Sequence, residues 1–258
     1  MCEQVLFFIH GNSGSSDCWE FQLNSDLLEN YRLIAIDLPA HGDSAASANP
    51  DSDYTLVQLG KTIAMAIIQL AGDNPYLVIG IFMGTNIVSE SLAFGLQPKG
   101  IVLAGSCLVG RKYQMAEFAY PDTNAYVVFA EQSTEEEVGK YAAQVMSNDN
   151  AAIAENFIRD YYKVKPPFRT SLFNSIQNLQ FIDELEMIAS IQSPILLIFG
   201  MEEKIINPDY LDNAGLDLWN NTVYKVPGAG HLVNLDQPET FNRLLMGYAQ
   251  EMVHLIRE

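Results

Sequence analysis

Basic residues are scarce in this chain of 258 residues. It has 14 Lys and Arg against 32 Asp and Glu, which gives a formal net charge of −18 at pH 7. Affinity for nucleic acid comes mainly from clustered Lys and Arg, and anionic membrane surfaces attract the same residues. The composition therefore argues against a nucleic-acid partner, against binding to an anionic membrane and against an anionic substrate.

Cysteine is equally scarce. The three cysteines, Cys2, Cys18 and Cys107, are odd in number and far apart, so the sequence offers neither a disulfide framework nor a C-x-x-C metal or redox site. No window approaches the ~20 apolar residues that span a bilayer, and the first residues lack the basic segment of a secretory signal. We expect a cytoplasmic protein with free thiols and no membrane association.

What the sequence does contain is an alternation of short apolar runs with longer segments of helical period. This alternation is typical of βαβ units around a parallel sheet, and near-continuous apolar runs suit strands that are covered on both faces. At ~100–200 residues per domain, the length fits one large α/β domain. The predicted strands are 5–9, 33–36, 76–81, 100–104, 195–199 and 222–226.

Apolar residues spaced three and four apart predict helices over 56–71, 85–94 and 238–256. Residues 108–191 break the alternation, because they hold several helical segments, among them 150–162, with no convincing buried strand. We interpret them as a helical cap inserted after strand 100–104, with residues 1–107 and 192–258 as the core. The cap is a candidate substrate lid, and an all-helical packing appendage is the alternative.

The loops that follow the first two predicted strands contain candidate functional residues. In the glycine-rich loop that starts at His10, the N–H of Asn12 can point into a cleft as an oxyanion donor. This loop has neither G-x-G-x-x-G nor G-x-x-x-x-G-K-[ST], so no nucleotide cofactor is expected. Residues 37–44 are interpreted as a structural turn, because Pro39 fixes φ and Gly42 supplies conformational freedom.

The third strand leads into a strand, sharp turn and helix, with Gly80 and Gly84 two residues on either side of Phe82. This is the layout of the G-x-S-x-G nucleophile elbow, in which a strained turn exposes the middle side chain and the glycines let strand and helix cross closely. A phenyl ring has no lone pair and cannot attack a carbonyl carbon. The segment therefore predicts an elbow without its nucleophile.

An acid and a histidine follow the last two predicted strands. Glu203 lies three residues after the glycine that ends one strand, and His231 lies in a glycine-rich loop after the next. A histidine that acts as general base needs a carboxylate on its far nitrogen to orient it. The order elbow, acid, histidine is the one expected when the three groups lie along one edge of a single sheet.

These segments carry a family resemblance. They are His10-Gly11, residues 37–42, Gly80 to Gly84, residues 200–203 and Gly230-His231, in that order over nearly the whole chain. The chain resembles the α/β-hydrolase fold superfamily, and within it bacterial N-acyl-homoserine lactonase-type and related carboxylic-ester hydrolases. The resemblance implies a mostly parallel sheet flanked by helices, with the cap inserted after strand 100–104.

The resemblance also implies a site of the serine-hydrolase type that needs no cofactor. The residue at position 82 would attack an ester or lactone carbonyl, His231 would take and return the proton, and Glu203 would orient His231. The N–H groups of Asn12 and Met83 would hold the oxyanion. The cap would shape the acyl pocket.

Two features depart from the family pattern. The two N-terminal strands that are usual in the family are absent, so we expect a sheet of about six strands. Phe82 lacks a nucleophilic atom, and a bulky residue held at a positive φ costs roughly 1–3 kcal/mol.

Three functions stay open. The chain can be a scaffold for hydrolysis of a small neutral ester or lactone that has lost its nucleophile. It can be a lyase or cofactor-free oxygenase that uses the His231–Glu203 dyad as general base, or an enzyme with Cys107 as substitute nucleophile, although such a cysteine is more often a small buried hydrophobe. It can be a non-catalytic binding or receptor protein for an apolar ligand. No metal is expected, because the four histidines have no ligand-like spacing.

Overall fold

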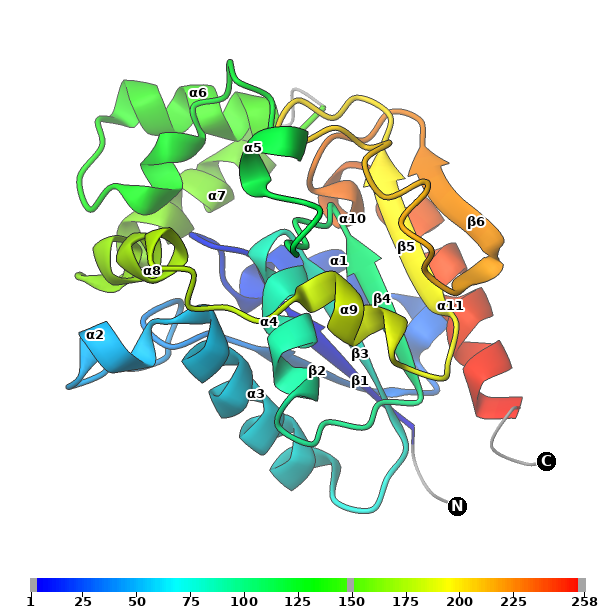
Figure 1. Cartoon of the computed structure of the whole chain (residues 1–258). Coiled ribbons are helices and arrows are strands. Elements are labelled where there is room, and N and C mark those ends of the chain that lie inside the picture. Colours follow the sequence, from blue (N-terminus) through cyan, green and yellow to red (C-terminus); the bar gives the residue numbers. More distant parts are fainter. Residues whose placement is uncertain (1–3, 148–150, 255–258) are drawn as a thin grey trace.

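A computed structural model describes residues 4–147 and 151–254, and within them the chain forms a parallel sheet between layers of helices (Figure 1). The sheet has six strands in the order β2-β1-β3-β4-β5-β6, and every neighbouring pair is parallel. The expected α/β fold with six strands is confirmed. The strands are β1 (Val5–Ile9), β2 (Arg32–Ile36), β3 (Tyr76–Ile81), β4 (Gly100–Ala104), β5 (Ile195–Gly200) and β6 (Leu218–Val226).

The inner strands were easier to predict than the strand at the far edge. β1, β3 and β4 have the predicted bounds, because they are short apolar runs buried by helices on both faces. β2 begins one residue earlier than predicted and β5 ends one residue later. β6 begins four residues earlier, at Leu218, and includes Asn220 and Asn221, both at positive φ. Because these two residues are polar, the apolar pattern does not predict the start of β6.

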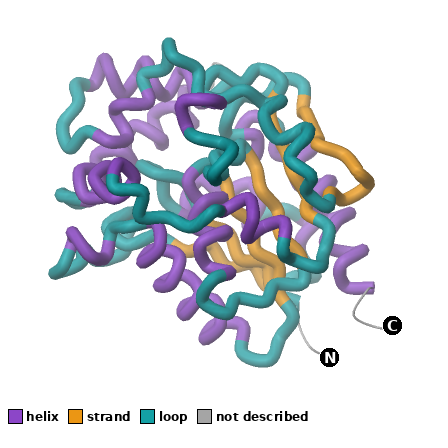
Figure 2. The backbone as a smooth tube through the Cα atoms, in the orientation of Figure 1, coloured by secondary structure: helices purple, strands orange, loops and turns teal. Residues whose placement is uncertain are grey.

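Helices cover the two faces of the sheet, with the strands in the middle layer (Figure 2). On one face, α3 (Leu56–Ala71) packs against α4 (Met83–Leu92), and α4 contacts α9 (Glu184–Ala189). On the other face, α11 (Pro238–His254) contacts α1 (Glu20–Leu23), α10 (Val233–Asp236) and β4. The shorter N-terminal helices are η1 (Ser16–Trp19), η2 (Asp26–Leu28) and α2 (Pro50–Asp53).

The predicted helix over 56–71 is confirmed as α3, whose apolar face is buried and whose N-terminus is capped by Thr55. The helix predicted over 85–94 is α4, which begins two residues earlier because the elbow turn leads directly into it, and which also ends two residues earlier, at Leu92. The predicted end of the last helix, at residue 256, lies outside the described residues.

The chain between β4 and β5 forms helices and no strand among the residues that the structure describes. These helices are α5 (Met115–Phe118), η3 (Ala125–Phe129), α6 (Glu135–Val145), α7 (Ala151–Lys163), α8 (Phe168–Gln177) and α9. In Figure 1, α6, α7 and α8 lie together beside the strand layer. The division into a core of residues 1–107 and 192–258 and a cap of residues 108–191 stays a prediction. We call residues 108–191 the cap segment.

Cys18 and Cys107 carry free thiols, and Cys2 lies outside the described residues. In the described part of the chain, no helix combines the length and the apolar composition that crossing a membrane requires.

Helices α3 and α4 approach each other most closely at a glycine. A Cβ added to Gly60 would overlap the Cβ of Glu90 and lie 2.9 Å from its carbonyl carbon. The Ser91 hydroxyl also donates a hydrogen bond to the Gly60 carbonyl oxygen, at 2.9 Å. Gly139, inside α6, is different, because an added Cβ there meets no heavy atom within 4 Å. One glycine is thus required by packing and the other is not.

Alanine at these two glycines is expected to change stability in opposite directions. Gly60→Ala forces α3 away from α4 and lowers the free energy of unfolding by about 1–3 kcal/mol, the usual range for overpacking. Gly139→Ala lowers the backbone entropy of the unfolded chain and raises the free energy of unfolding by about 0.5–1 kcal/mol. Urea unfolding followed by circular dichroism measures both, and equal effects of the two substitutions would contradict this packing.

Candidate active site

The predicted site residues lie at one edge of the sheet, each just beyond the end of a strand. Asn12 follows β1, Phe82 follows β3, Glu203 follows β5 and His231 follows β6. The carboxyl ends of parallel strands meet at the same edge, and ligands of open α/β sheets bind where the strand order reverses. That reversal falls between β1 and β3, because β2 lies on one side of β1 and the later strands lie on the other. The loop of Asn12 and the elbow of Phe82 therefore flank the reversal point.

Phe82 occupies the apex of a strained turn. Its φ is +53° and its ψ is −126°, and α4 begins at the next residue. The flanking glycines allow the close crossing: a Cβ on Gly80 would lie 2.6 Å from the carbonyl oxygen of Gly84, and one on Gly84 would overlap the carbonyl oxygen of Ile9. The strand, turn and helix of a nucleophile elbow are present. The conformation costs roughly 1–3 kcal/mol for a side chain of this size.

His231 and Glu203 form a buried pair. His231 Nδ1 lies 2.5 Å from Glu203 Oε1, and both side chains are fully buried. Glu203 Oε2 accepts a hydrogen bond from the Ile205 N–H at 3.1 Å, which fixes the carboxylate. Because a carboxylate oxygen accepts, Nδ1 is the donor of this hydrogen bond. In a neutral ring Nε2 is then an acceptor, the form in which a histidine removes a proton from a nucleophile.

No nucleophile stands in front of that acceptor. The ring of Phe82 meets the imidazole edge-on, with 4.8 Å between the two centroids. His231 Nε2 is buried and has no hydrogen-bond partner among the described residues. The structure thus brings Phe82, Glu203 and His231 together, and the side chain next to the imidazole carries no proton that a base could take.

The predicted oxyanion donors are close to this ring. Among the described residues, neither the N–H of Asn12 nor that of Met83 has a hydrogen-bond acceptor. The Asn12 side chain donates to the Val128 carbonyl oxygen at 2.7 Å, which ties its loop to the cap segment. A Cβ on Gly11 would lie 2.6 Å from Cδ1 of Phe82, so the phenyl ring packs directly against the same loop.

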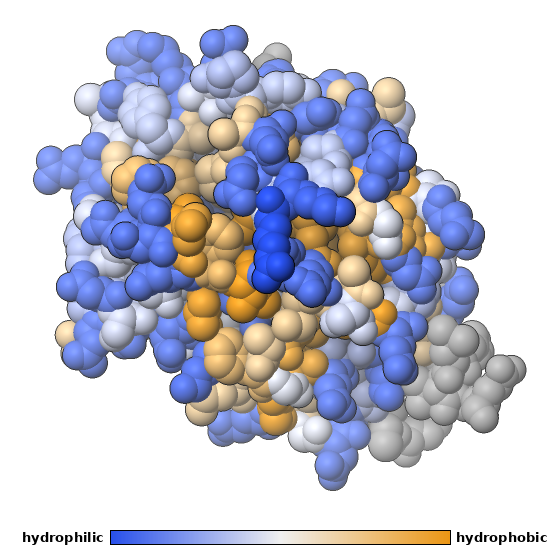
Figure 3. Space-filling model, viewed as in Figure 1, coloured by the Kyte–Doolittle hydropathy of each residue, from blue (hydrophilic) through white to orange (hydrophobic). Residues whose placement is uncertain are grey.

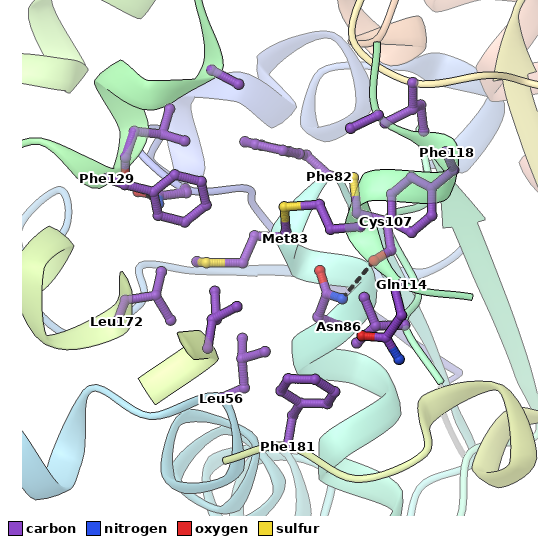
Figure 4. Close-up of a pocket in the computed structure, with 18 of the residues that line it drawn as sticks. Leu56, Phe82, Met83, Asn86, Cys107, Gln114, Phe118, Phe129, Leu172 and Phe181 are labelled. Carbon is purple, nitrogen blue, oxygen red and sulfur yellow. Dashed lines mark hydrogen bonds between the residues drawn. The ribbon is translucent and has the colours of Figure 1, made fainter. Parts of the chain in front are cut away.

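A cavity of about 500 Å³ opens beside the elbow, between α4 and the cap segment. Met83, Asn86 and Phe82 form its floor (Figure 4). Its walls are largely apolar and include Leu56, Val109, Phe118, Phe129, Leu172 and Phe181. Met115 and Leu179 line the cavity and are exposed, and Figure 3 shows apolar side chains in the middle of the face that carries α5, α8 and α9. Such a cavity suits an uncharged organic molecule.

Phe82 also borders a second cavity, of about 180 Å³. The second cavity is lined in part by Gly11, Cys18, Phe21, Phe157, Leu232 and Leu235. The phenyl ring is therefore a wall shared by the two cavities. The cleft beside the elbow is open, and the phenyl ring of Phe82 occupies the place where an elbow presents its nucleophilic atom.

Cys107 lines the larger cavity, but its surroundings oppose a role as nucleophile. Burial, with smaller contributions from the carboxylates of Glu203 and Glu184, raises the pKa of its thiol well above the usual value. Its Sγ contacts the Gly105 carbonyl oxygen at 3.7 Å, which is no base. A thiol in this setting stays protonated and reacts slowly.

Sequence reasoning missed a buried polar network under the larger cavity. Asn86 Nδ2 donates to Glu184 Oε2 at 2.7 Å and to the Cys107 carbonyl oxygen at 2.8 Å, and the Val109 N–H donates to the same Glu184 oxygen at 2.9 Å. Burial raises the pKa of Glu184 well above its usual range, and the nearby Glu90 adds to this. No motif signals the network, because its members come from α4, the loop after β4 and α9.

Two other histidines, His10 and His41, accept hydrogen bonds from the backbone of the loops at this edge of the sheet. His10 Nε2 accepts from the Leu38 N–H at 2.9 Å, and His41 Nε2 accepts from the Ser13 N–H at 3.2 Å. Burial lowers the pKa of both rings. In the described residues, no three His, Cys, Asp or Glu side chains gather as a metal site would need.

The loop of residues 37–44 is a turn fixed by one carboxylate. Asp37 accepts from the N–H groups of Ser16 at 2.7 Å and Asp43 at 2.9 Å, and Gly42 has a φ of +48°. These bonds join the loops after β1 and β2, in line with the structural role expected from the sequence.

The sheet, its helices and the elbow together are those of the α/β-hydrolase fold. The alpha/beta hydrolase fold family matches this chain over residues 4–238, so the chain belongs to that family. An uncharacterized hydrolase of Bacillus subtilis, YugF, is 27% identical over 247 residues, which cover 92% of this chain and 86% of the relative. A putative non-heme bromoperoxidase of Mycobacterium tuberculosis, BpoC, is 24% identical over 253 residues, 94% of this chain and 92% of the relative.

Solved structures share the fold at low sequence identity. A variant of the N-acyl homoserine lactonase AidH in complex with N-hexanoyl homoserine lactone superposes with a TM-score of 0.86 and 23% identity, covering 97% of this chain and 91% of that chain. The esterase RhEst1 of a Rhodococcus species gives 0.81 and 20%, covering 97% and 91%. The resemblance to lactonases and esterases is confirmed at the level of fold.

Replacement of Glu90 is expected to change how stability depends on pH. Burial raises the pKa of Glu90 from 4.5 to about 7, against the opposing hydrogen bond from the Ile182 N–H. Between pH 4.5 and pH 7 the folded chain holds a proton here that the unfolded chain has released, so the free energy of unfolding falls as pH rises, by up to about 3 kcal/mol, and then levels off.

The variant Glu90→Gln keeps the shape of the side chain and removes this titration. It should be more stable than the parent at pH 8 and nearly equal to it at pH 4.5. Urea unfolding at both pH values measures the difference, with Glu186→Gln, at an exposed position of α9, as control. A parent and a Glu90→Gln variant with parallel pH profiles would refute the assignment.

Proposed function

We propose that this protein is an inactive α/β hydrolase that binds a small neutral carboxylic ester or lactone and does not hydrolyse it. The observation that carries the proposal is the pairing of Phe82 with His231, 4.8 Å between ring centroids, where a hydrolase has a nucleophile and its base. Ligand binding needs the cavity alone, whereas acyl transfer also needs a nucleophilic atom at position 82.

The ligand class rests on the cavity and on the relatives. A largely apolar cavity of about 500 Å³ favours an uncharged acyl or aromatic group, and a net charge of −18 disfavours an anion. Among the chains of the same fold are a lactonase in complex with N-hexanoyl homoserine lactone and several esterases. In this proposal the cap segment covers the bound ligand, and the free thiols fit a cytoplasmic location.

The groups around position 82 support a hydrolase origin of the site. Glu203 holds His231 with Nε2 as acceptor, and the N–H groups of Asn12 and Met83 have no acceptor among the described residues and are free to hold an oxyanion. With a serine at position 82, His231 would take the hydroxyl proton, the hydroxyl oxygen would attack the carbonyl carbon, and the proton would pass to the leaving group.

Non-covalent general-base chemistry, as in a lyase or a cofactor-free oxygenase, is less favoured by this geometry. A base must come within about 2.6–3.2 Å of the proton that it removes. His231 Nε2 is buried with the Phe82 ring against the imidazole, so a substrate proton reaches it only if that ring moves. A binding or receptor role needs no such movement.

Serine at position 82 is expected to create an esterase. Phe82→Ser supplies the missing oxygen and should hydrolyse p-nitrophenyl butyrate or a γ-lactone about 10²–10⁴ times faster than Phe82→Ala, the contribution of a positioned base. Release of p-nitrophenol and labelling by a fluorophosphonate probe measure the gain.

Three proteins serve as controls for this gain. The parent chain should give neither turnover nor labelling, Phe82→Ala opens the same space without a hydroxyl group, and Phe82→Ser combined with His231→Ala removes the base. If Phe82→Ser unfolds cooperatively yet is no faster than Phe82→Ala, the hydrolase origin of the site is refuted. Turnover by the parent chain that disappears in His231→Ala would instead establish the general-base alternative.

A further inference from the structure

The amide of Asn86 lies in the floor of the larger cavity, one turn along α4 from Met83. The residue is only 6% exposed, and its side chain is directed by the network beneath it. One Nδ2 hydrogen goes to Glu184 Oε2 at 2.7 Å and the other to the Cys107 carbonyl oxygen at 2.8 Å. Both amide hydrogens are thereby used within the protein.

This network fixes which end of the amide faces the cavity. The two partners of Nδ2 are a carboxyl oxygen and a carbonyl oxygen, and the Glu184 oxygen already receives the Val109 N–H at 2.9 Å. A flipped amide would set Oδ1 against the carbonyl oxygen of Cys107, where it would be repelled. Figure 4 shows the nitrogen of Asn86 bonded to Cys107 and the oxygen turned toward the cavity. Oδ1 has no donor among the described residues.

The other amides around the cavity are already paired or lie at its rim. Asn12 donates through Nδ2 to Val128 and accepts through Oδ1 from the Ser13 hydroxyl. Gln114 and Gln177 are at exposed positions, and Gln114 donates through Nε2 to the Gly110 carbonyl oxygen at 2.9 Å. The buried floor thus presents a hydrogen-bond acceptor without a donor of its own.

We infer that Asn86 Oδ1 selects ligands that carry an N–H or O–H donor next to their apolar part. The inference rests on the proposed function and narrows its ligand class. A plain ester has acceptors only, so it would bury Oδ1 without a partner and bring its own oxygens against it. An N-acyl lactone, with an amide N–H beside its acyl chain, satisfies Oδ1 and places the chain against the apolar walls. Asn86 is in this sense a specificity-determining residue.

The test compares two ligands that differ in one atom. N-hexanoyl homoserine lactone has the amide N–H, and its O-acyl analogue has an ester oxygen in that place with the same length and ring. Isothermal titration calorimetry on the parent chain, which holds Phe82, measures the dissociation constants of both. The amide is expected to bind at least about tenfold more tightly, because a buried acceptor without a donor weakens binding by that order.

Two variants locate the discrimination. Asn86→Leu is close in volume and removes Oδ1, so the two ligands should bind it within about twofold of each other. Thr123→Val removes a hydroxyl group from the wall of the same cavity and should keep the tenfold preference. Asn86→Leu also deprives Glu184 of a donor, so its folding is checked by urea unfolding. If Asn86→Leu does not fold, the two dissociation constants on the parent chain and on Thr123→Val still test the inference, because equal affinities for the two ligands contradict it.

The outcomes separate this inference from the proposed function. If both ligands bind the parent chain equally well, the role of Asn86 is refuted and the proposed function stands. If neither ligand binds, both are refuted. A preference that persists in folded Asn86→Leu, or disappears in Thr123→Val, also refutes the role of Asn86.

Discussion

The site depends on the close crossing of strand and helix at the elbow. Gly80 and Gly84 bring β3, α4 and the end of β1 so near to one another that a single added Cβ would overlap backbone atoms. The chain must therefore reverse direction within one residue, and position 82 takes its positive φ even with a phenyl ring attached. The same turn starts α4 at Met83. It thereby sets the direction of the Met83 N–H and, one turn later, of the Asn86 side chain.

A phenyl ring at the apex changes the chemistry of this site and leaves its geometry in place. His231 remains bonded to Glu203 at 2.5 Å, and Glu203 remains bonded to the backbone of Ile205, because neither contact involves position 82. The effect of the ring is local: the imidazole lies against an apolar side chain, and its Nε2 is buried without a hydrogen-bond partner among the described residues, although an imidazole acceptor prefers a donor. The hydrogen bonds of His231 and Glu203 therefore do not depend on the side chain at position 82.

The sequence predicted those parts of the molecule that depend on local pattern. The strands β1, β3 and β4 and the helix α3 are set by apolar periodicity, and the meeting of Glu203 with His231 follows because the ends of parallel strands share one edge. The start of β6 was missed, since Asn220 and Asn221 interrupt the apolar run. The bonds of Asn86 to Glu184 and Cys107 were missed as well. The first exists because α9 packs against α4, and the second because the loop after β4 passes beside α4. Both contacts join residues far apart in sequence, which periodicity does not record.

The strain at Phe82 and the unpaired Nε2 are both unfavourable, at roughly 1–3 kcal/mol each, so the ring must be stabilised by its packing. The contacts are visible: the ring lies against the imidazole of His231 and the backbone of Gly11, and it borders both cavities. A small side chain at this position would leave the two cavities joined and their apolar walls facing each other across empty space, which also costs free energy. Phe82 is therefore a wall between the two cavities, built on a turn that has the form of a nucleophile elbow.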